Sequence, residues 1–227
     1  MNRTVIAVLA AVLVGGQAFS AEVREPLAAV SSASSTSAIL GKVESANSSV
    51  RSLESGFSQT KTLKVSGKKI VSAGTLYFRN DGRLSMKYSK PAGELLVVSG
   101  NRFHMDRGGK AMTFDTLKNQ MMGSLAKTLT GCIKGAPQQV AADNGADISA
   151  AETSEGYSVI LASKGQVKRG YSRIELLYRK SDCVLMKMSM TEPSGTVTVY
   201  EMKDVKKNVS FPEDVFRIPS GRSQAQK

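Results

Sequence analysis

Side chains suited to nucleophilic or metal chemistry are few and scattered in this chain. It contains one histidine, His104, and two cysteines, Cys132 and Cys183. A catalytic thiol would need His104 as its base, and one histidine gives no His/Cys cluster with the spacing of a metal site. The G-x-S-x-G, phosphate-binding and dinucleotide-binding motifs are also missing from the sequence. We therefore expect a protein that is not an enzyme and uses no metal and no cofactor.

His104 lies in the segment RFHMD, whose alternation is that of a β-strand. The alternation puts Phe103 and Met105 on one face and His104 with Arg102 and Asp106 on the other. A histidine on the polar face of a strand is typically exposed or hydrogen-bonded. We expect the same of His104.

The segment VLMKMSMTE contains the most informative apolar pattern. In a strand, Met186, Met188 and Met190 project to one face and the intervening polar residues to the other. Unbranched thioether side chains form a soft, adaptable surface. Such a stripe either packs an ordinary core or lines a cavity for a flexible apolar ligand such as an acyl chain, and the pattern leaves both possibilities open.

The N-terminal residues indicate export. A positively charged start, residues 1–3, is followed by an apolar run from Val5 to Val14 and by small residues at Ala18 and Ser20. This pattern predicts a cleaved signal peptide over residues 1–20, because an apolar run of about ten residues is too short to span a bilayer. In an exported chain Cys132 and Cys183 either form a disulfide or remain as two buried or half-buried free thiols.

The charge balance restricts the partners. The formal net charge is +12, with 31 Lys and Arg against 19 Asp and Glu. In an exported protein this favours anionic membranes, acidic proteins or polyanionic glycans, and an aromatic content of 6% argues against base stacking on nucleic acid. Lys61, Lys64, Lys68 and Lys69 cluster in one expected hairpin. They either dock an acidic transporter surface or keep strand edges soluble.

Periodicity indicates how the chain is organised. Residues 21–38 are small and polar, which predicts a flexible leader. Apolar residues then recur at spacings of three and four from Ile39 to Phe57, which predicts an amphipathic helix. Six segments of period two follow, then a helical pattern from Leu117 to Cys132, five more period-two segments and a last short strand in VFRIP. We expect one domain over residues 39–221, a strongly curved antiparallel sheet or open barrel of about eleven strands, followed by a flexible tail over residues 222–227.

The order of four segments resembles the LolA family of periplasmic outer-membrane lipoprotein carriers. The segments are SLESGFSQTKT, GTLYFRNDGRLSMKYSKPAGELLVVSGNRFHM, FDTLKNQMMGSLAKTLTGCIKG and NVSFPEDVFRIPSG. The resemblance implies a mainly β fold with α, an unclosed antiparallel β-barrel covered by a helical lid. It also implies a monomeric periplasmic chaperone without cofactor, which takes acylated lipoproteins from an inner-membrane ABC transporter to an outer-membrane lipoprotein acceptor.

The resemblance and the apolar faces together give the expected acyl-binding residues. Those on the strands are Leu76, Phe78, Leu84, Met86, Leu96, Val98, Met112, Phe114, Met186, Met188 and Met190, and those on the lid are Met121, Leu125 and Leu129.

In the LolA family an arginine commonly holds the lid shut through hydrogen bonds to backbone carbonyls. Aligned without gaps, Asn80 falls at the position of this arginine and Asp81 at that of the following proline. A shift of one residue would place Arg79 there, although it would also turn the side chain to the opposite face of the strand. The candidate latch residues are therefore Arg79 and Asn80.

The family also contains proteins with other tasks. Some relatives are sensors of envelope stress, and others carry different lipids for dedicated exporters. The alternative function is therefore that of a LolA-fold sensor or a carrier of another lipid.

Overall fold

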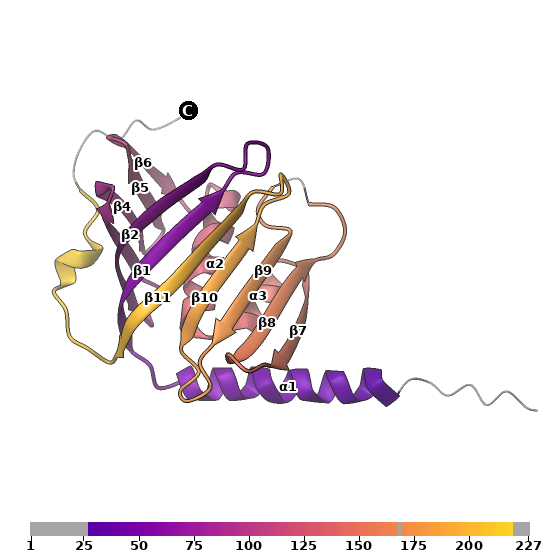
Figure 1. Ribbon diagram of the computed structural model, residues 1–227. Coiled ribbons are helices and arrows are strands. Elements are labelled where there is room, and N and C mark those ends of the chain that lie inside the picture. Colours follow the sequence, from indigo (N-terminus) through magenta and orange to yellow (C-terminus); the bar gives the residue numbers. More distant parts are fainter. Residues whose placement is uncertain (1–26, 168, 220–227) are drawn as a thin grey trace, which may run out of the picture.

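The chain folds as one antiparallel sheet of eleven strands in the order β6-β5-β4-β3-β2-β1-β11-β10-β9-β8-β7 (Figure 1). The computed structural model describes residues 27–167 and 169–219, with side chains from residue 35 onward. The sheet curves strongly, and its edge strands β6 and β7 do not pair with each other. The prediction of an unclosed barrel of about eleven strands is confirmed. The strands are β1 (Ser52–Thr62), β2 (Lys69–Arg79), β3 (Leu84–Lys90), β4 (Ala92–Ser99), β5 (Arg102–Arg107), β6 (Lys110–Asp115), β7 (Ala146–Glu152), β8 (Tyr157–Ser163), β9 (Arg173–Tyr178), β10 (Leu185–Thr191) and β11 (Val197–Lys207).

Within the described residues, three α-helices and one short 3-10 helix accompany the sheet. Helices α2 (Gln120–Lys134) and α3 (Pro137–Asp143) connect the two edge strands and cover the concave face (Figure 1). Helix α1 (Leu27–Asn47) runs along one end of the sheet beside β7, and η1 (Glu213–Phe216) lies on the outer side. None of the helices in the described ranges is long and apolar enough to cross a membrane.

Alternating apolar residues form the β2–β3 hairpin as expected. Leu76 pairs with Met86 and Phe78 with Leu84, and all four side chains are buried on the concave face. The turn between the strands closes at Gly82, whose φ of 86° is in the left-handed region that glycine adopts without strain. This face forms the floor of the interior.

The predicted bounds of the first helix, Ile39 and Phe57, are both wrong. Helix α1 ends at Asn47, whose side-chain Nδ2 donates to the Val43 carbonyl at 2.9 Å, and Phe57 lies in β1. A spacing of four residues also fits a strand, because positions four apart share a face in both structures. At its other end α1 begins at Leu27, so the expected flexible leader is helical from that residue. The expected signal peptide and C-terminal tail lie outside the described residues.

Two further elements differ from expectation. The helical pattern predicted from Leu117 to Cys132 is followed by a second, unexpected short helix, α3, which begins at Pro137 because proline fits the first turn of a helix. The VFRIP segment is no strand, since Val215 and Phe216 end the 3-10 helix η1. Both of these adjacent residues are buried.

Gly74 in β2 provides a test of the packing inside the sheet. A Cβ at this position would lie 2.1 Å from the Lys87 carbonyl oxygen and 2.9 Å from Phe57 Cε1. We expect Gly74→Ala to lower the free energy of unfolding by about 1–3 kcal/mol through overpacking. Gly56→Ala on the neighbouring strand is the matched control, because its Cβ would meet nothing closer than 3.7 Å. Urea denaturation that finds equal stability for both variants would contradict this account.

Candidate functional site

The concave face of the sheet and the inner side of α2 form one continuous apolar cluster. Strands β2, β3, β4 and β10 contribute from the sheet, and α2 contributes from above. Most of the residues expected to bind acyl chains therefore lie together. Buried in this cluster are Leu76, Phe78, Leu84, Met86, Leu96, Val98, Leu129, Met188 and Met190, with Phe114 and Leu125 packed against it.

Three expected residues lie outside this cluster. The register of β10 shifts between Leu185 and Lys187, so a β-bulge at Met186 breaks the alternation and Leu185 takes the buried position. The expectation that Met186 shares a face with Met188 is therefore wrong. Met112 is half-buried on the edge strand β6, and Met121 on α2 is 48% exposed.

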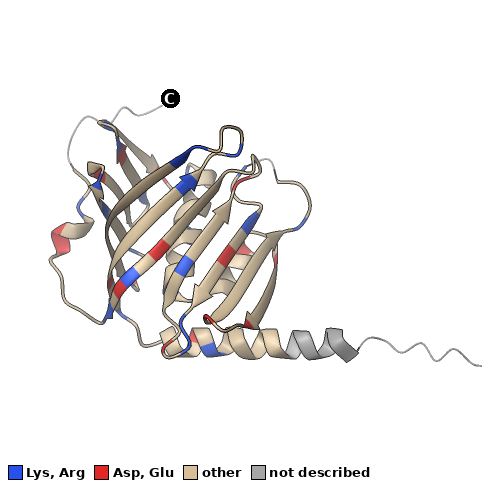
Figure 2. Cartoon of the chain, in the orientation of Figure 1, with Lys and Arg blue, Asp and Glu red and all other residues tan. Residues whose placement is uncertain are grey.

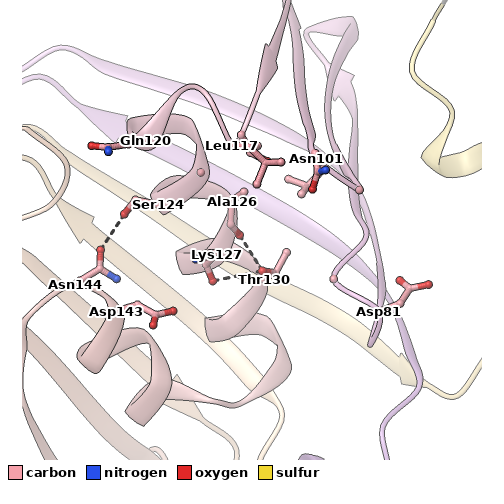
Figure 3. A pocket seen from close by; sticks show the side chains of 15 residues that line it. Asp81, Asn101, Leu117, Gln120, Ser124, Ala126, Lys127, Thr130, Asp143 and Asn144 are labelled. Carbon is pink, nitrogen blue, oxygen red and sulfur yellow. Dashed lines mark hydrogen bonds between the residues drawn. The ribbon is translucent and has the colours of Figure 1, made fainter.

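Helix α2 is fixed closely to α3, so the two helices form a single lid. The helix begins at Asn119, whose side chain accepts from the Met122 amide, and ends at Gly135 with a φ of 78°. A Cβ at Gly131 would lie 2.4 Å from Val140 of α3, so glycine permits the close approach. Ser124 Oγ also donates to Asn144 Oδ1 at 3.0 Å (Figure 3).

The lid fills the interior almost completely. A partly open cavity beneath it, lined by Ile133 of the lid together with strand residues such as Leu76 and Met202, measures about 10 Å³. This is roughly the volume that a single water-sized probe occupies. An acyl chain can therefore enter only if the lid moves away from the sheet.

Two open pockets flank α2. The first, of about 590 Å³, is lined by polar residues of α2 such as Gln120, Lys127 and Thr130 and by Asp81 of the β2–β3 turn (Figure 3). The second, of about 660 Å³, is lined by the apolar residues Met121, Met122 and Leu125 of α2 and by residues of the β8–β9 and β10–β11 connections. Met122 and Leu125 line the second pocket and also contact the core, so this pocket adjoins the apolar interior.

Comparison with known proteins agrees with this geometry. The family model described as outer membrane lipoprotein carrier protein LolA matches residues 48–219. The chain belongs to the LolA family. A search of curated proteins finds no match.

Solved structures similar to this LolA-family chain have low sequence identity. A putative outer membrane lipoprotein-sorting protein domain from Vibrio parahaemolyticus has 9% identity and a TM-score of 0.48, covering 81% of this chain and 97% of its own. A LolA superfamily protein from Nitrosomonas europaea has 11% identity and a TM-score of 0.41, with 81% and 98% coverage. A MucB structure has 17% identity and a TM-score of 0.49, covering 82% of this chain and 64% of its own.

The two latch candidates of this LolA-family protein do not hold the lid. Among the described residues, the side chain of Arg79 forms ion pairs with Asp81 and Glu213, and neither partner belongs to α2 or α3. Glu213 lies in η1 on the outer side of the sheet. Asn80 is exposed, and its backbone amide donates to the Arg51 carbonyl. The expected latch contact is therefore absent from this closed form, because the strand directs Arg79 away from the interior.

Tyr178 of β9 makes the contact that was expected of an arginine. Its hydroxyl donates to the Cys132 carbonyl in the last turn of α2 at 3.1 Å. Complete burial raises the pKa of Tyr178 well above its ordinary value, so the hydroxyl keeps its proton and remains a donor. The alternation of Ile174, Leu176 and Tyr178 could have placed this residue on the inner face, but its partner depends on where the lid lies.

The two cysteines do not form a disulfide. Both are free and buried, which corrects the disulfide candidate and leaves the alternative of two free thiols. Burial raises the pKa of Cys132 to about 12, which suppresses the thiolate through which a disulfide would form.

Of the two expectations for His104, exposed or hydrogen-bonded, the second agrees with the structure, in which the side chain is buried on the outer face of the sheet. It is 2% exposed, and its Nδ1 lies 2.8 Å from Thr113 Oγ1. Its neighbours in register, Val97 and Ser85, are also fully buried, and η1 contacts their strands β3 and β4. His104 has no access to either pocket. No group of three or more His, Cys, Asp or Glu side chains in the described ranges could hold a metal ion.

Tyr178→Phe tests the contact between the sheet and the lid. We expect the variant to lose about 1 kcal/mol of unfolding free energy, because the Cys132 carbonyl loses a buried donor. Hydrogen exchange of the α2 amides should accelerate about fivefold. Tyr77→Phe is the control, since the Tyr77 hydroxyl has no hydrogen-bond partner within the described part of the chain. Unchanged exchange in α2 for Tyr178→Phe would exclude the latch role.

His104 predicts how stability depends on pH. Burial lowers the pKa of His104 below its ordinary value near 6.5, with opposing effects from Asp106 and Arg102. Below about pH 6.5 the unfolded chain binds a proton that the folded chain does not. The free energy of unfolding therefore decreases as the pH is lowered, by at most about 1.4 kcal/mol per pH unit. His104→Gln should flatten the profile between pH 5 and about 7, because His104 is the sole histidine. A slope that persists in this variant would contradict the assignment.

Proposed function

We propose that this protein is a periplasmic chaperone that binds the acyl chains of lipoproteins between its concave sheet and the α2–α3 lid. It receives them from an inner-membrane lipoprotein-releasing ABC transporter and delivers them to an outer-membrane lipoprotein acceptor. The observation that carries the proposal is the single apolar interior beneath a separate helical lid, in a chain whose family model is described as a lipoprotein carrier. Export through a cleaved signal peptide over residues 1–20 belongs to the same proposal.

The filled interior suggests a mechanism of exchange. In the closed form α2 covers the apolar floor, and cargo replaces α2 when the lid opens. Burying an acyl chain contributes roughly 0.8 kcal/mol per methylene, so a sixteen-carbon chain contributes on the order of 10 kcal/mol. This is enough to offset the lost contacts of the lid. Binding and release of this kind require no catalysis and no cofactor.

The interior residues are suited to a flexible guest. Met86, Met188 and Met190 are buried in the floor, and their unbranched side chains can follow the shape of different acyl chains. Leu129 closes the floor from the lid, and Met121 and Leu125 mark the apolar entrance. These residues remain our expected acyl contacts.

One observation favours the alternative function. Both latch candidates, Arg79 and Asn80, lie away from the lid, so the closed form is not held as expected for the common carriers of the family. A LolA-fold sensor of envelope stress, or a carrier of another lipid for a dedicated exporter, would retain the fold while departing in this contact.

A release assay tests the proposed function. The purified mature protein is incubated with inner-membrane spheroplasts whose lipoproteins carry labelled palmitate. We expect a soluble one-to-one complex of protein and labelled lipoprotein. If no lipoprotein is released, and the protein instead retains a membrane-bound regulator or a free lipid, the alternative function replaces the proposal.

A variant at the apolar entrance tests the route into the interior. Met121→Arg places a charge in the second pocket, where the residue is already 48% exposed, so the fold should tolerate it. We expect at least about a tenfold loss of lipoprotein release, since the acyl chain must pass a desolvated charge. Leu117→Arg is the matched control, because Leu117 is 72% exposed and lines the polar pocket. Equal loss in both variants would exclude the second pocket as the entrance.

A further inference from the structure

One end of the sheet carries a concentration of positive charge. The strands are antiparallel to their neighbours, so the β1–β2, β3–β4, β5–β6, β8–β9 and β10–β11 connections all lie at this end. Their exposed basic residues, which we call the basic rim, include Lys64, Lys68, Lys69, Lys90, Lys110 and Lys164. Figure 2 shows blue segments, which mark Lys and Arg, along the β1–β2 hairpin. Glu192 at the same end is already paired with Lys61 at 3.0 Å.

The tip of the β1–β2 hairpin also exposes apolar side chains. Val65 is 100% exposed, Ile70 43% and Val71 55%, and these are three of the five large apolar side chains exposed in the described part of the chain. The hairpin also extends past the β3–β4 turn, because the pairing of β2 with β3 begins only at Ala73 (Figure 1). An exposed apolar tip of this kind marks an interaction surface.

Backbone hydrogen bonds fix the shape of this tip. The Leu63 amide donates to the Lys68 carbonyl and the Gly67 amide to the Leu63 carbonyl, both at 2.9 Å. Gly67 adopts a φ of 64°, which permits the tight turn. The turn therefore presents Val65 outward between Lys64 and Lys68, and it does so without a partner to cover the valine.

We propose that the β1–β2 hairpin docks the protein on an anionic lipid bilayer. Val65 enters the boundary between headgroups and acyl chains, and Lys64, Lys68 and Lys69 contact the anionic headgroups. A lipid interface satisfies both features, since it accepts apolar side chains and attracts the ammonium groups that surround them. An acidic protein surface would match the lysines, but Val65 would then also need an apolar pocket on that one protein, whereas a bilayer offers apolar volume at every point of its surface.

The position of the hairpin adds a second argument. The second pocket is lined by Tyr171 and Arg169 of the β8–β9 connection and by Glu192 and Pro193 at the β10–β11 turn. Both connections belong to the same end of the sheet as the hairpin. Docking through the hairpin therefore brings the apolar entrance to the bilayer. The docking itself needs no cargo, so it can be tested independently of the proposed function.

Vesicle sedimentation tests the docking. The mature protein should sediment with phosphatidylcholine vesicles that contain phosphatidylglycerol, and at least about tenfold less with phosphatidylcholine alone. Val65→Ser and the double variant Lys68→Glu, Lys69→Glu should each lower binding severalfold. Lys118→Glu with Lys203→Glu is the matched control, because both lysines are exposed, neither forms an ion pair among the described residues, and they follow β6 and lie in the second half of β11, away from the hairpin. Binding that falls equally in the control variant would overturn the proposal.

A tryptophan reporter tests whether the tip enters the lipid. The chain contains no tryptophan, so Val65→Trp provides a unique fluorophore. Its emission should shift to the blue on anionic vesicles and be quenched by brominated lipids, whereas Lys203→Trp should show neither effect. Sedimentation without a blue shift at position 65 would mean that another surface, or charge alone, binds the vesicles. No sedimentation at all would favour an acidic protein as the partner of the lysines. Either result overturns membrane docking by the hairpin.

Discussion

The apolar contact between α2 and the concave face of the sheet is the interaction on which the rest of the structure depends. An unclosed sheet has two edges with unpaired backbone groups and one apolar face. Both the edges and the apolar face are unfavourable in water unless another element covers them. Helices α2 and α3 bridge the edges β6 and β7 and bury Leu129, Cys132 and Ile133 against the floor. Because the same floor is the expected binding surface, lid and cargo compete for one set of contacts. In the proposed function, the contacts that stabilise the closed form are the same contacts that cargo must replace.

A small cluster of aromatic side chains lies on the outer face of the sheet. This cluster explains the position of Arg79. Phe211 stacks edge-on against Tyr77 and Phe216, and Arg83 lies over the Phe216 ring. Arg79 and Arg83 both pair with Glu213 on η1. The hairpin turn between β2 and β3 thus fastens the C-terminal segment to the outside of the sheet. The lid is held instead by apolar packing and by the hydrogen bond from Tyr178.

Local sequence patterns correctly predicted strands whose neighbours in the sheet can be inferred from alternating apolar residues. The β2–β3 hairpin was predictable because Leu76, Phe78, Leu84 and Met86 fit only a two-residue period around a turn. Phe57 was misassigned, since a spacing of four from Leu53 suits a helix and a strand equally well.

Other features depend on contacts between distant segments. The bulge at Met186 adds one residue to a strand without a signal in the methionine stripe. The burial of His104 and the hydrogen bond of Tyr178 depend on where η1 and α2 come to lie, which no local pattern encodes. The family resemblance predicted the fold correctly. It also placed the latch at Arg79 or Asn80, beside the β2–β3 turn, but in this chain Arg79 contacts η1 on the outer face of the sheet.

A closed interior also follows from the cost of an empty one. An unfilled apolar cavity destabilises a protein by about 24 cal/mol per Å³, so a vacant cavity of roughly 400 Å³ would cost on the order of 10 kcal/mol. That is about the whole unfolding free energy of a typical domain. A dry and unfilled apolar interior of that size would therefore remove much of the stability of the fold. Helix α2 occupies this space with Leu129, Cys132 and Ile133 buried against the floor, which removes this penalty.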